Sequence, residues 1–235
     1  MVLAFRAAAI PIVCVAVIFQ RNPYVYAVVK GSGIHKPQDF VGKRLMLPPD
    51  AEIQHNALMQ KLGIPPTDMT YAPYDRDEPF LAEGRIDAQV VYRIGSGLRL
   101  EKNGLDLEFI WMADYGIRLY ADSIVTSEKM IREKPDLVQR FLMAALKGWQ
   151  YAIEHPGDAL SATLAYDNTL SPDYQMRMLQ IQTPLIHTGD HPIGWMRPEV
   201  WQDMESFIRF KGDKKKIQAY TLDFIKPIYG EKERG

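Results

Sequence analysis

Acidic and aromatic side chains carry most of the binding chemistry that this sequence offers. Asp50 and Glu52 follow two prolines at the expected start of a helix, a position where exposed backbone N–H groups and the helix dipole favour an anion. Two carboxylates there repel a sulfonate or phosphate and accept hydrogen bonds from an amino group. Tyr115 can stack on a flat ring and donate through its phenol. These residue types favour a flat, amine-bearing or neutral heterocycle, although Asp50 can also serve simply as a helix cap.

The other candidate ligand-binding residues lie at strand ends or in the segment around Tyr115: Gln20, Tyr92, Asp114 and Tyr120. The carboxamide at position 20 can bond a ligand amide or cap its own strand. The tyrosines can contact a ligand or pack in the core. Both interpretations stay open at this point.

No combination of residues predicts a catalytic centre, a metal or a cofactor. Cys14 is the only cysteine, so it forms neither an internal disulfide nor a cysteine-based metal site. His187 and His191 are four residues apart, but Gly189 and Pro192 indicate a loop rather than one helix face. The sequence also lacks the short motifs of serine hydrolases, nucleotide-binding loops and zinc proteases. The prediction is a binding protein and not an enzyme.

Composition excludes several classes of protein. The chain has 235 residues, 47% hydrophobic and 24% charged, with a formal net charge of -1. These values are typical of a folded globular protein, and the balanced charge makes a nucleic-acid partner unfavourable. An uncharged run over residues 7–19 is too short to cross a membrane. Its β-branched residues and the absence of a small-residue cleavage site favour a buried strand, Ile10 to Phe19, over a signal peptide.

The elements that must position these residues alternate between strand and helix patterns up to residue 112. Strands are expected at 24–30, 44–47, 69–73, 88–92 and 107–112, with helices at 50–62, 78–83 and 97–102. This order predicts a mostly parallel sheet. From Ile124 onward the pattern is helical, and one helix after Pro135 carries apolar residues at three-to-four spacing: Val138, Phe141, Leu142, Ala145, Trp149, Ala152 and Ile153. That spacing makes Trp149 a core residue.

A two-lobed α/β protein follows from this order. We expect residues 1–22 to be the remnant of a first lobe, residues 23–115 to form a mostly parallel second lobe, and residues 116–235 to cross back and supply helices to the first lobe. A ligand would bind where strand ends, helix starts and the crossing segments meet.

A family resemblance rests on residues 114–156. Asp114-Tyr115-Gly116-Ile117, Gly148-Trp149, Tyr151-Ala152 and His155-Pro156 resemble the NMT1/THI5-like periplasmic solute-binding proteins. The earlier Val17-Ile18-Phe19-Gln20 and the later Ile193-Gly194 agree with it. The resemblance implies a type II periplasmic binding-protein fold, a small-molecule ligand, an ABC permease partner and a periplasmic location.

Two departures from the family pattern qualify these expectations. Family members begin with two or three additional β-α units, so the first lobe is expected to be incomplete and the chain to self-associate through an open edge. After Tyr92, the family often carries an Asn-Glu pair where this sequence has Gly95 and Ser96. The carboxylate suited to an aminopyrimidine is therefore absent from that place.

Three functions are consistent with this pattern. The first is a solute-binding component of an ABC importer for a heterocycle, related to the thiamine pyrimidine. The second is a ligand-sensing or degenerate binding domain without a transport role. The third, disfavoured because the family's fungal enzymes carry a cysteine-rich motif, is a pyrimidine-synthesising enzyme of the THI5 type.

Overall fold

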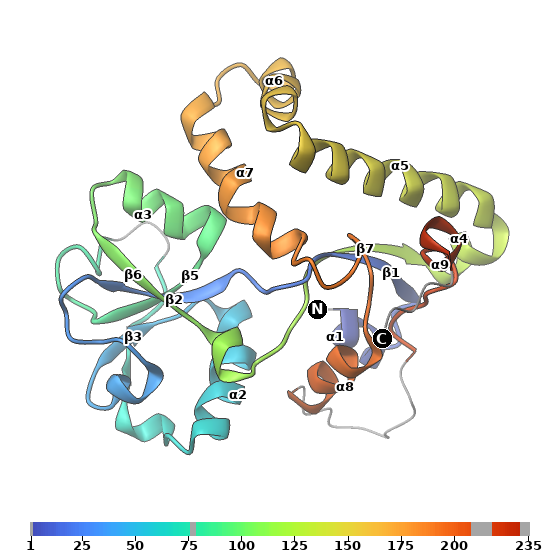
Figure 1. The fold of residues 1–235 in the computed structure, drawn as a ribbon. Helices are drawn as coiled ribbons and strands as arrows, with labels where there is room; N and C mark the ends of the chain where they lie inside the picture. Colours follow the sequence, from blue (N-terminus) through green and yellow to red (C-terminus); the bar gives the residue numbers. More distant parts are fainter. Residues whose placement is uncertain (1, 76–78, 208–217, 231–235) are drawn as a thin grey trace. The chain divides into compact units, whose positions relative to one another are not determined.

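The computed structural model describes residues 2–75, 79–207 and 218–230 (Figure 1). The chain divides into two compact units. Unit 1 combines Met1–Asn22 with Leu119–Gly235, and unit 2 is the continuous segment Pro23–Arg118. The chain therefore leaves unit 1 at the step from Asn22 to Pro23 and re-enters it at Leu119.

A buried strand, β1 (Ile12–Phe19), forms the centre of unit 1. Seven of its eight residues are buried, which confirms the predicted buried strand, although it begins two residues later than expected and Ile10 is exposed. It pairs antiparallel with β7 (Ala121–Ser127). Its β-branched side chains require cover on both faces, and the C-terminal helices of the same unit provide part of it.

The second edge of β1 is also hydrogen-bonded. The Cys14 N–H donates to the carbonyl of Ala219 at 2.9 Å, and the Thr221 N–H donates to the carbonyl of Cys14 at 3.0 Å. Farther along, the Val17 N–H donates to the carbonyl of Gly194 at 3.1 Å. Two distant segments thus occupy the edge that lies away from β7.

The helices of unit 1 complete its core. The short helix α1 (Val2–Ala7) places Leu3 beside Cys14, Met196 and Trp201 in one buried cluster. Helix α8 (Pro198–Phe207) supplies Trp201 to it. The other helices are α4 (Glu128–Glu133), α5 (Pro135–Glu154), α6 (Pro156–Tyr166), α7 (Pro172–Ile186) and α9 (Lys226–Tyr229).

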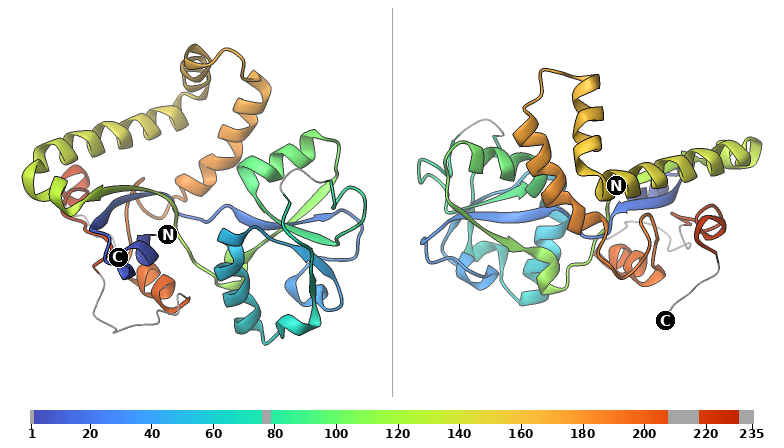
Figure 2. Two further views of the ribbon diagram at one scale, coloured as in Figure 1. Left: turned by 180° about the vertical axis from the view of Figure 1, so that it is seen from behind. Right: turned by 45° about the horizontal axis from the view of Figure 1, so that its top comes forward.

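The apolar stripe of α5 is only partly covered. Val138, Leu142 and Leu146 are buried, whereas Phe141 is 61% exposed and Trp149 is half-buried. The prediction that Trp149 lies in the core is therefore wrong. Figure 2 shows α6 and α7 continuing from α5 and leading back toward the end of β1, where the Gln20 N–H donates to the carbonyl of Leu185.

Unit 2 contains a five-stranded sheet in the order β4-β3-β5-β2-β6. Its strands are β2 (Tyr24–Val29), β3 (Arg44–Met46), β4 (Thr70–Tyr71), β5 (Ala88–Tyr92) and β6 (Leu107–Trp111). Strand β3 runs parallel to β4 and β5, but β2 runs antiparallel to both β5 and β6. Strands β3, β4, β5 and β6 thus run in one direction, as predicted for a mostly parallel sheet, and β2 is the exception. The sheet is mixed because β2 inserts in the opposite direction between two strands that come much later in the chain.

Helices and short turns connect the strands of this sheet. The predicted helix after Asp50 is α2 (Glu52–Leu62), which ends at Gly63 in the left-handed conformation, as its C-cap pattern indicates. Helix α3 (Leu98–Lys102) follows a π turn (Arg93–Gly97). The helix expected at 78–83 is not formed: residues 80–84 make one hydrogen-bonded turn that closes at Gly84 with φ of +66°, while residue 78 lies outside the described residues.

Candidate functional site

One edge of the unit 2 sheet collects the predicted ligand-binding residues of that unit. Strands β3, β5 and β6 end at this edge, and the antiparallel β2 begins there. The register places Tyr24 opposite Tyr92 and the next residue, Val25, opposite Trp111. The 3₁₀ turn Pro49–Ala51 and the 3₁₀ turn Met112–Tyr115 belong to the connections that leave this edge. Strand ends and following turns are where α/β folds place their ligands.

Tyr24, Asp50 and Tyr92 form the centre of this group. The Tyr24 hydroxyl donates a hydrogen bond to a carboxylate oxygen of Asp50. The rings of Tyr24 and Tyr92 meet edge to face, with centroids 5.1 Å apart and planes at 76°, a favourable arrangement for two aromatic rings. We call Tyr24, Asp50 and Tyr92 the tyrosine–carboxylate cluster.

Asp50 does not cap α2. The N-cap residue of that helix is Ala51, and no side chain bonds the helix start. The capping prediction is therefore wrong, because the 3₁₀ turn inserts before the helix and leaves the carboxylate to accept from Tyr24 instead. Glu52 is the first residue of α2 and is exposed. Both carboxylates thus lie at the start of α2, where the helix dipole stabilises negative charge.

A glycine turn fixes Asp114 and Tyr115. Gly116 ends their 3₁₀ turn with φ of +77°, and Lys61 of α2 donates to its carbonyl at 3.2 Å. An added Cβ at Gly116 would meet only the flexible end of the Lys61 side chain, so it is the left-handed backbone conformation that favours glycine at this position. Asp114 is exposed and Tyr115 is half-buried. Burial, followed by the charges of Asp114 and Asp39, raises the pKa of the Tyr115 phenol, which therefore stays protonated and able to donate at neutral pH.

The turn after Tyr92 uses its polar residues internally. The Ser96 hydroxyl accepts from the Tyr92 backbone N–H at 3.0 Å. Arg93 is buried and makes a two-pronged ion pair with Glu101 at 2.9 and 3.0 Å, while its guanidinium lies 4.1 Å from the centre of the Phe109 ring. This pair anchors the turn to α3 and holds the end of β5 in place.

A buried histidine lies between two tyrosines in the same unit. His55 on α2 is 1% exposed. Its Nδ1 is 2.7 Å from the Tyr26 hydroxyl, and its Nε2 is 2.9 Å from the Tyr71 hydroxyl. Whichever ring nitrogen carries the hydrogen, one hydroxyl donates and the other accepts. Burial lowers the pKa of His55 from 6.5 to about 4, so the ring is neutral and its role is to connect α2 to β2 and β4.

Gln20 and Tyr120 belong to unit 1. The Gln20 amide nitrogen donates to the carbonyls of Val17 and Trp195, both at 2.9 Å, which ties the strand end to a loop. Tyr120 is 6% exposed, packs against Trp201 and accepts from the Arg197 N–H at 2.8 Å. Because these contacts place Tyr120 in the core, we leave it out of the ligand-binding group that we propose.

The sequence interpretation missed Tyr24. The sequence feature that could have identified it is its position directly after Pro23, where an aromatic residue begins the first strand after the predicted boundary between the two lobes. Within the described ranges, no group of three or more His, Cys, Asp or Glu side chains is arranged to hold a metal ion. Helices long and apolar enough to cross a bilayer are likewise missing from the part of the chain that the structure describes.

Comparison with known proteins identifies the family. The family model described as NMT1/THI5 like matches residues 1–159. The chain belongs to the NMT1/THI5-like family. Two curated relatives are binding proteins by name. The riboflavin-binding protein RibY of Chloroflexus aurantiacus is 22% identical, over 95% of this chain and 68% of its own length. A formylaminopyrimidine-binding protein of Halalkalibacterium halodurans is 25% identical, over 54% of this chain and 41% of its own length.

Solved structures establish the fold class. A putative sulfonate-binding SsuA protein of Methylobacillus flagellatus matches 95% of this chain and 70% of its own, with a TM-score of 0.67 and 16% identity. The family member has the α/β fold of periplasmic solute-binding proteins, as its sequence predicts. That fold also occurs in the desulfurization enzyme DszB, which matches 93% of this chain and 79% of its own with a TM-score of 0.58 and 14% identity.

Proposed function

We propose that this family member is the solute-binding component of an ABC importer and that its ligand is a flat, amine-bearing nitrogen heterocycle such as an aminopyrimidine. The observation that carries this proposal is the tyrosine–carboxylate cluster at one edge of the unit 2 sheet. The proposal places the protein outside the cytoplasmic membrane, where it would deliver the ligand to a permease. The names of the two curated relatives, which bind riboflavin and a formylaminopyrimidine, support a heterocyclic ligand.

The chemistry of the cluster fits an amino group better than an anion. A carboxylate offers about four acceptor positions, and the Tyr24 hydroxyl occupies one of those on Asp50. The remaining positions can accept from an exocyclic amino group. Asp50, Glu52 and Asp114 all carry negative charge near the same sheet edge, which disfavours a sulfonate at this edge. The rings of Tyr92 and Tyr115 supply flat surfaces on which a heterocycle can stack.

The presence of Ser96 instead of a carboxylate lowers the affinity that we expect for an aminopyrimidine. Its hydroxyl is already hydrogen-bonded to the Tyr92 backbone, at the place where the family resemblance implies a carboxylate. A ring amino group left without that partner in a desolvated site loses about 1 to 3 kcal/mol. We therefore propose modest binding, weaker by about 5- to 150-fold than a site with both carboxylates.

Isothermal titration calorimetry with 4-amino-2-methylpyrimidine, riboflavin and taurine tests the proposal. We expect one-to-one binding of the aminopyrimidine and no heat from taurine. Asp50→Asn should weaken aminopyrimidine binding at least fivefold. The matched control is Asp106→Asn, because Asp106 is an exposed carboxylate at the opposite edge of the same sheet, 3.5 Å from Lys30.

Three results would contradict the proposal. Tight taurine binding without a response to the aminopyrimidine would show that the ligand is an anion and not a heterocycle. Equal effects of Asp50→Asn and Asp106→Asn on aminopyrimidine affinity would show that the tyrosine–carboxylate cluster is not the binding site. The absence of binding heat with all three ligands would favour the second candidate function, a binding domain that has lost its transport role. The hydrogen bond of the Ser96 hydroxyl to the Tyr92 backbone supports this candidate.

A further inference from the structure

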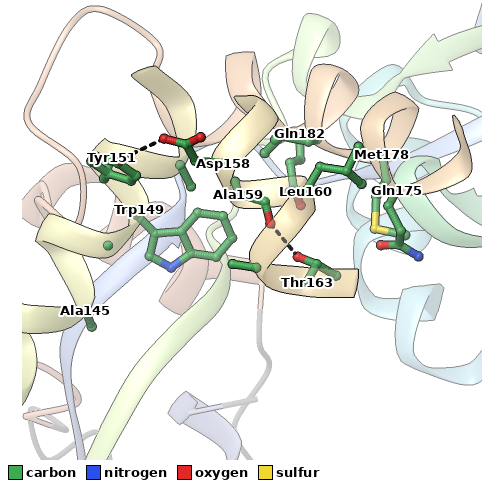
Figure 3. A pocket seen from close by; sticks show the side chains of 14 residues that line it. Ala145, Trp149, Tyr151, Asp158, Ala159, Leu160, Thr163, Gln175, Met178 and Gln182 are labelled. Carbon is green, nitrogen blue, oxygen red and sulfur yellow. Dashed lines mark hydrogen bonds between the residues drawn. The ribbon is translucent and has the colours of Figure 1, made fainter. Parts of the chain in front are cut away.

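Helices α5, α6 and α7 line an open cavity of about 480 Å³ within unit 1 (Figure 3). It is lined only by residues of unit 1, so it is separate from the tyrosine–carboxylate cluster. Its volume falls within the range of small-molecule sites in proteins. Helix α6, which the structure describes in full, has no buried residue although six of its eleven residues are Ala, Leu or Tyr. Exposed apolar surface of this kind is typical of ligand-binding grooves and interaction sites.

The walls of this cavity suit a planar ring system. The Trp149 indole of α5 and the Met178 thioether of α7 both line it. Small residues on α5, including Ala145 and Gly148, leave the space beside Trp149 open. An indole face and a polarisable sulfur both make favourable contacts with an aromatic ring.

Two carboxamides provide the polar contacts. Gln175 and Gln182 line the cavity from α7, and neither side chain has a hydrogen-bond partner among the described residues. They are seven residues apart, so they share one helix face at a separation of about 10 Å. A ligand that meets both must be longer than a single six-membered ring.

The other polar side chains of the lining already make internal hydrogen bonds. Asp158 accepts from the Tyr151 hydroxyl at 2.7 Å, and the Thr163 hydroxyl donates to the carbonyl of Ala159 at 2.9 Å. No basic residue lines the cavity among the described residues. An anionic ligand would therefore meet no compensating charge and would face the Asp158 carboxylate, whereas the two neutral carboxamides have both donors and acceptors available to orient an uncharged ligand.

We infer that this cavity is a second binding site, which takes an uncharged fused-ring heteroaromatic molecule whose edges carry hydrogen-bonding groups. The rings lie between Trp149 and Met178, and the edges meet the carboxamides of Gln175 and Gln182. The inference stands independently of the proposed function, because no residue of unit 2 contributes to the cavity.

Lumichrome, an uncharged fluorescent alloxazine, is a suitable probe. Its fluorescence anisotropy should rise in a saturable, one-to-one titration with the full chain. Gln182→Leu removes one carboxamide and should weaken binding about threefold to tenfold. Ala162→Trp fills the cavity from α6 and should abolish binding. The matched control is Gln180→Leu, because Gln180 is an exposed residue of α7 that does not line the cavity, and it should leave the affinity unchanged.

Far-ultraviolet circular dichroism and the thermal midpoint establish that each variant is folded. Lumichrome titration in the presence of saturating 4-amino-2-methylpyrimidine separates this site from the cluster in unit 2, since the aminopyrimidine should leave lumichrome binding unchanged. The inference is overturned if lumichrome shows no saturable binding, or if Ala162→Trp and Gln182→Leu bind as the parent does. Light scattering that shows a stable dimer disrupted by Ala162→Trp would also overturn it, because a second copy would then fill the cavity.

Discussion

The buried His55 makes unit 2 sensitive to acid, and the size of the effect follows from its environment. An unfolded chain binds a proton at an ordinary histidine pKa of 6.5, whereas burial holds the folded value at about 4. Between these two values the unfolded state carries more protons, so the free energy of unfolding decreases as the pH falls. At about 1.4 kcal/mol for each pKa unit, the full loss is about 3 kcal/mol. This stability is fully present above pH 6.5 and is lost by about pH 4.

The test replaces His55 by glutamine, which can still donate and accept but does not titrate. Urea unfolding of the parent and of His55→Gln should be followed between pH 7.5 and pH 4. His55→Gln should be less stable than the parent at pH 7.5, because the bonds to Tyr26 and Tyr71 are disturbed. Its stability should then fall less steeply, and the two proteins should differ in pH dependence by about 3 kcal/mol.

A matched substitution separates burial from the mere presence of a histidine. His35 is an exposed histidine of the same unit, 3.0 Å from Glu108. His35→Gln should keep the acid sensitivity of the parent. Identical pH profiles for the parent and His55→Gln would refute the reasoning, since the loss of stability would then come from other groups.

Three further substitutions have expected outcomes. Gly194→Ala should lower the free energy of unfolding by about 2 to 4 kcal/mol in urea titrations. Gly194 has a φ of +90°, and an added Cβ would meet Leu146 at 2.6 Å. An unchanged unfolding midpoint would contradict this prediction. Glu101→Gln should cost about 3 kcal/mol by the same measurement, since it leaves the buried Arg93 guanidinium without its charge partner. Ser127→Ala should cost about 1 kcal/mol, because the Ser127 hydroxyl accepts from a backbone amide at the start of α4, whereas Ser161→Ala on the exposed face of α6 should cost less.

Local patterns predicted the individual elements well. The β-branched run before Gln20 predicted β1, and the apolar run 88–92 predicted β5 with its bounds. Helix α2 and its glycine stop also follow from local signals. These features depend on side chains within a few residues of one another, which a single sequence displays directly.

Pairing between distant segments could not be predicted. Strand β2 lies antiparallel between β5 and β6, more than 60 residues later in the chain, and no local signal records that choice. The pair of Tyr24 and Asp50 depends on the same register, so Asp50 alone looked like a helix cap. Burial by distant segments was equally hard to predict. Helical spacing identifies the apolar stripe that contains Phe141, but it does not show how much of that stripe a neighbouring element covers.

The hydrogen bonds on both edges of β1 have a consequence during synthesis. This apolar strand is made before its partners in β7, at Gly194 and at Ala219, which follow about 100 to 200 residues later. At about 5 to 20 residues per second, the ribosome needs roughly 10 to 40 s to supply the last of them. Unit 2 is continuous and can form during that interval, while β1 waits with unpaired backbone groups. Unpaired apolar strands of this kind are prone to aggregate, so a shortened delay should raise the yield of folded protein.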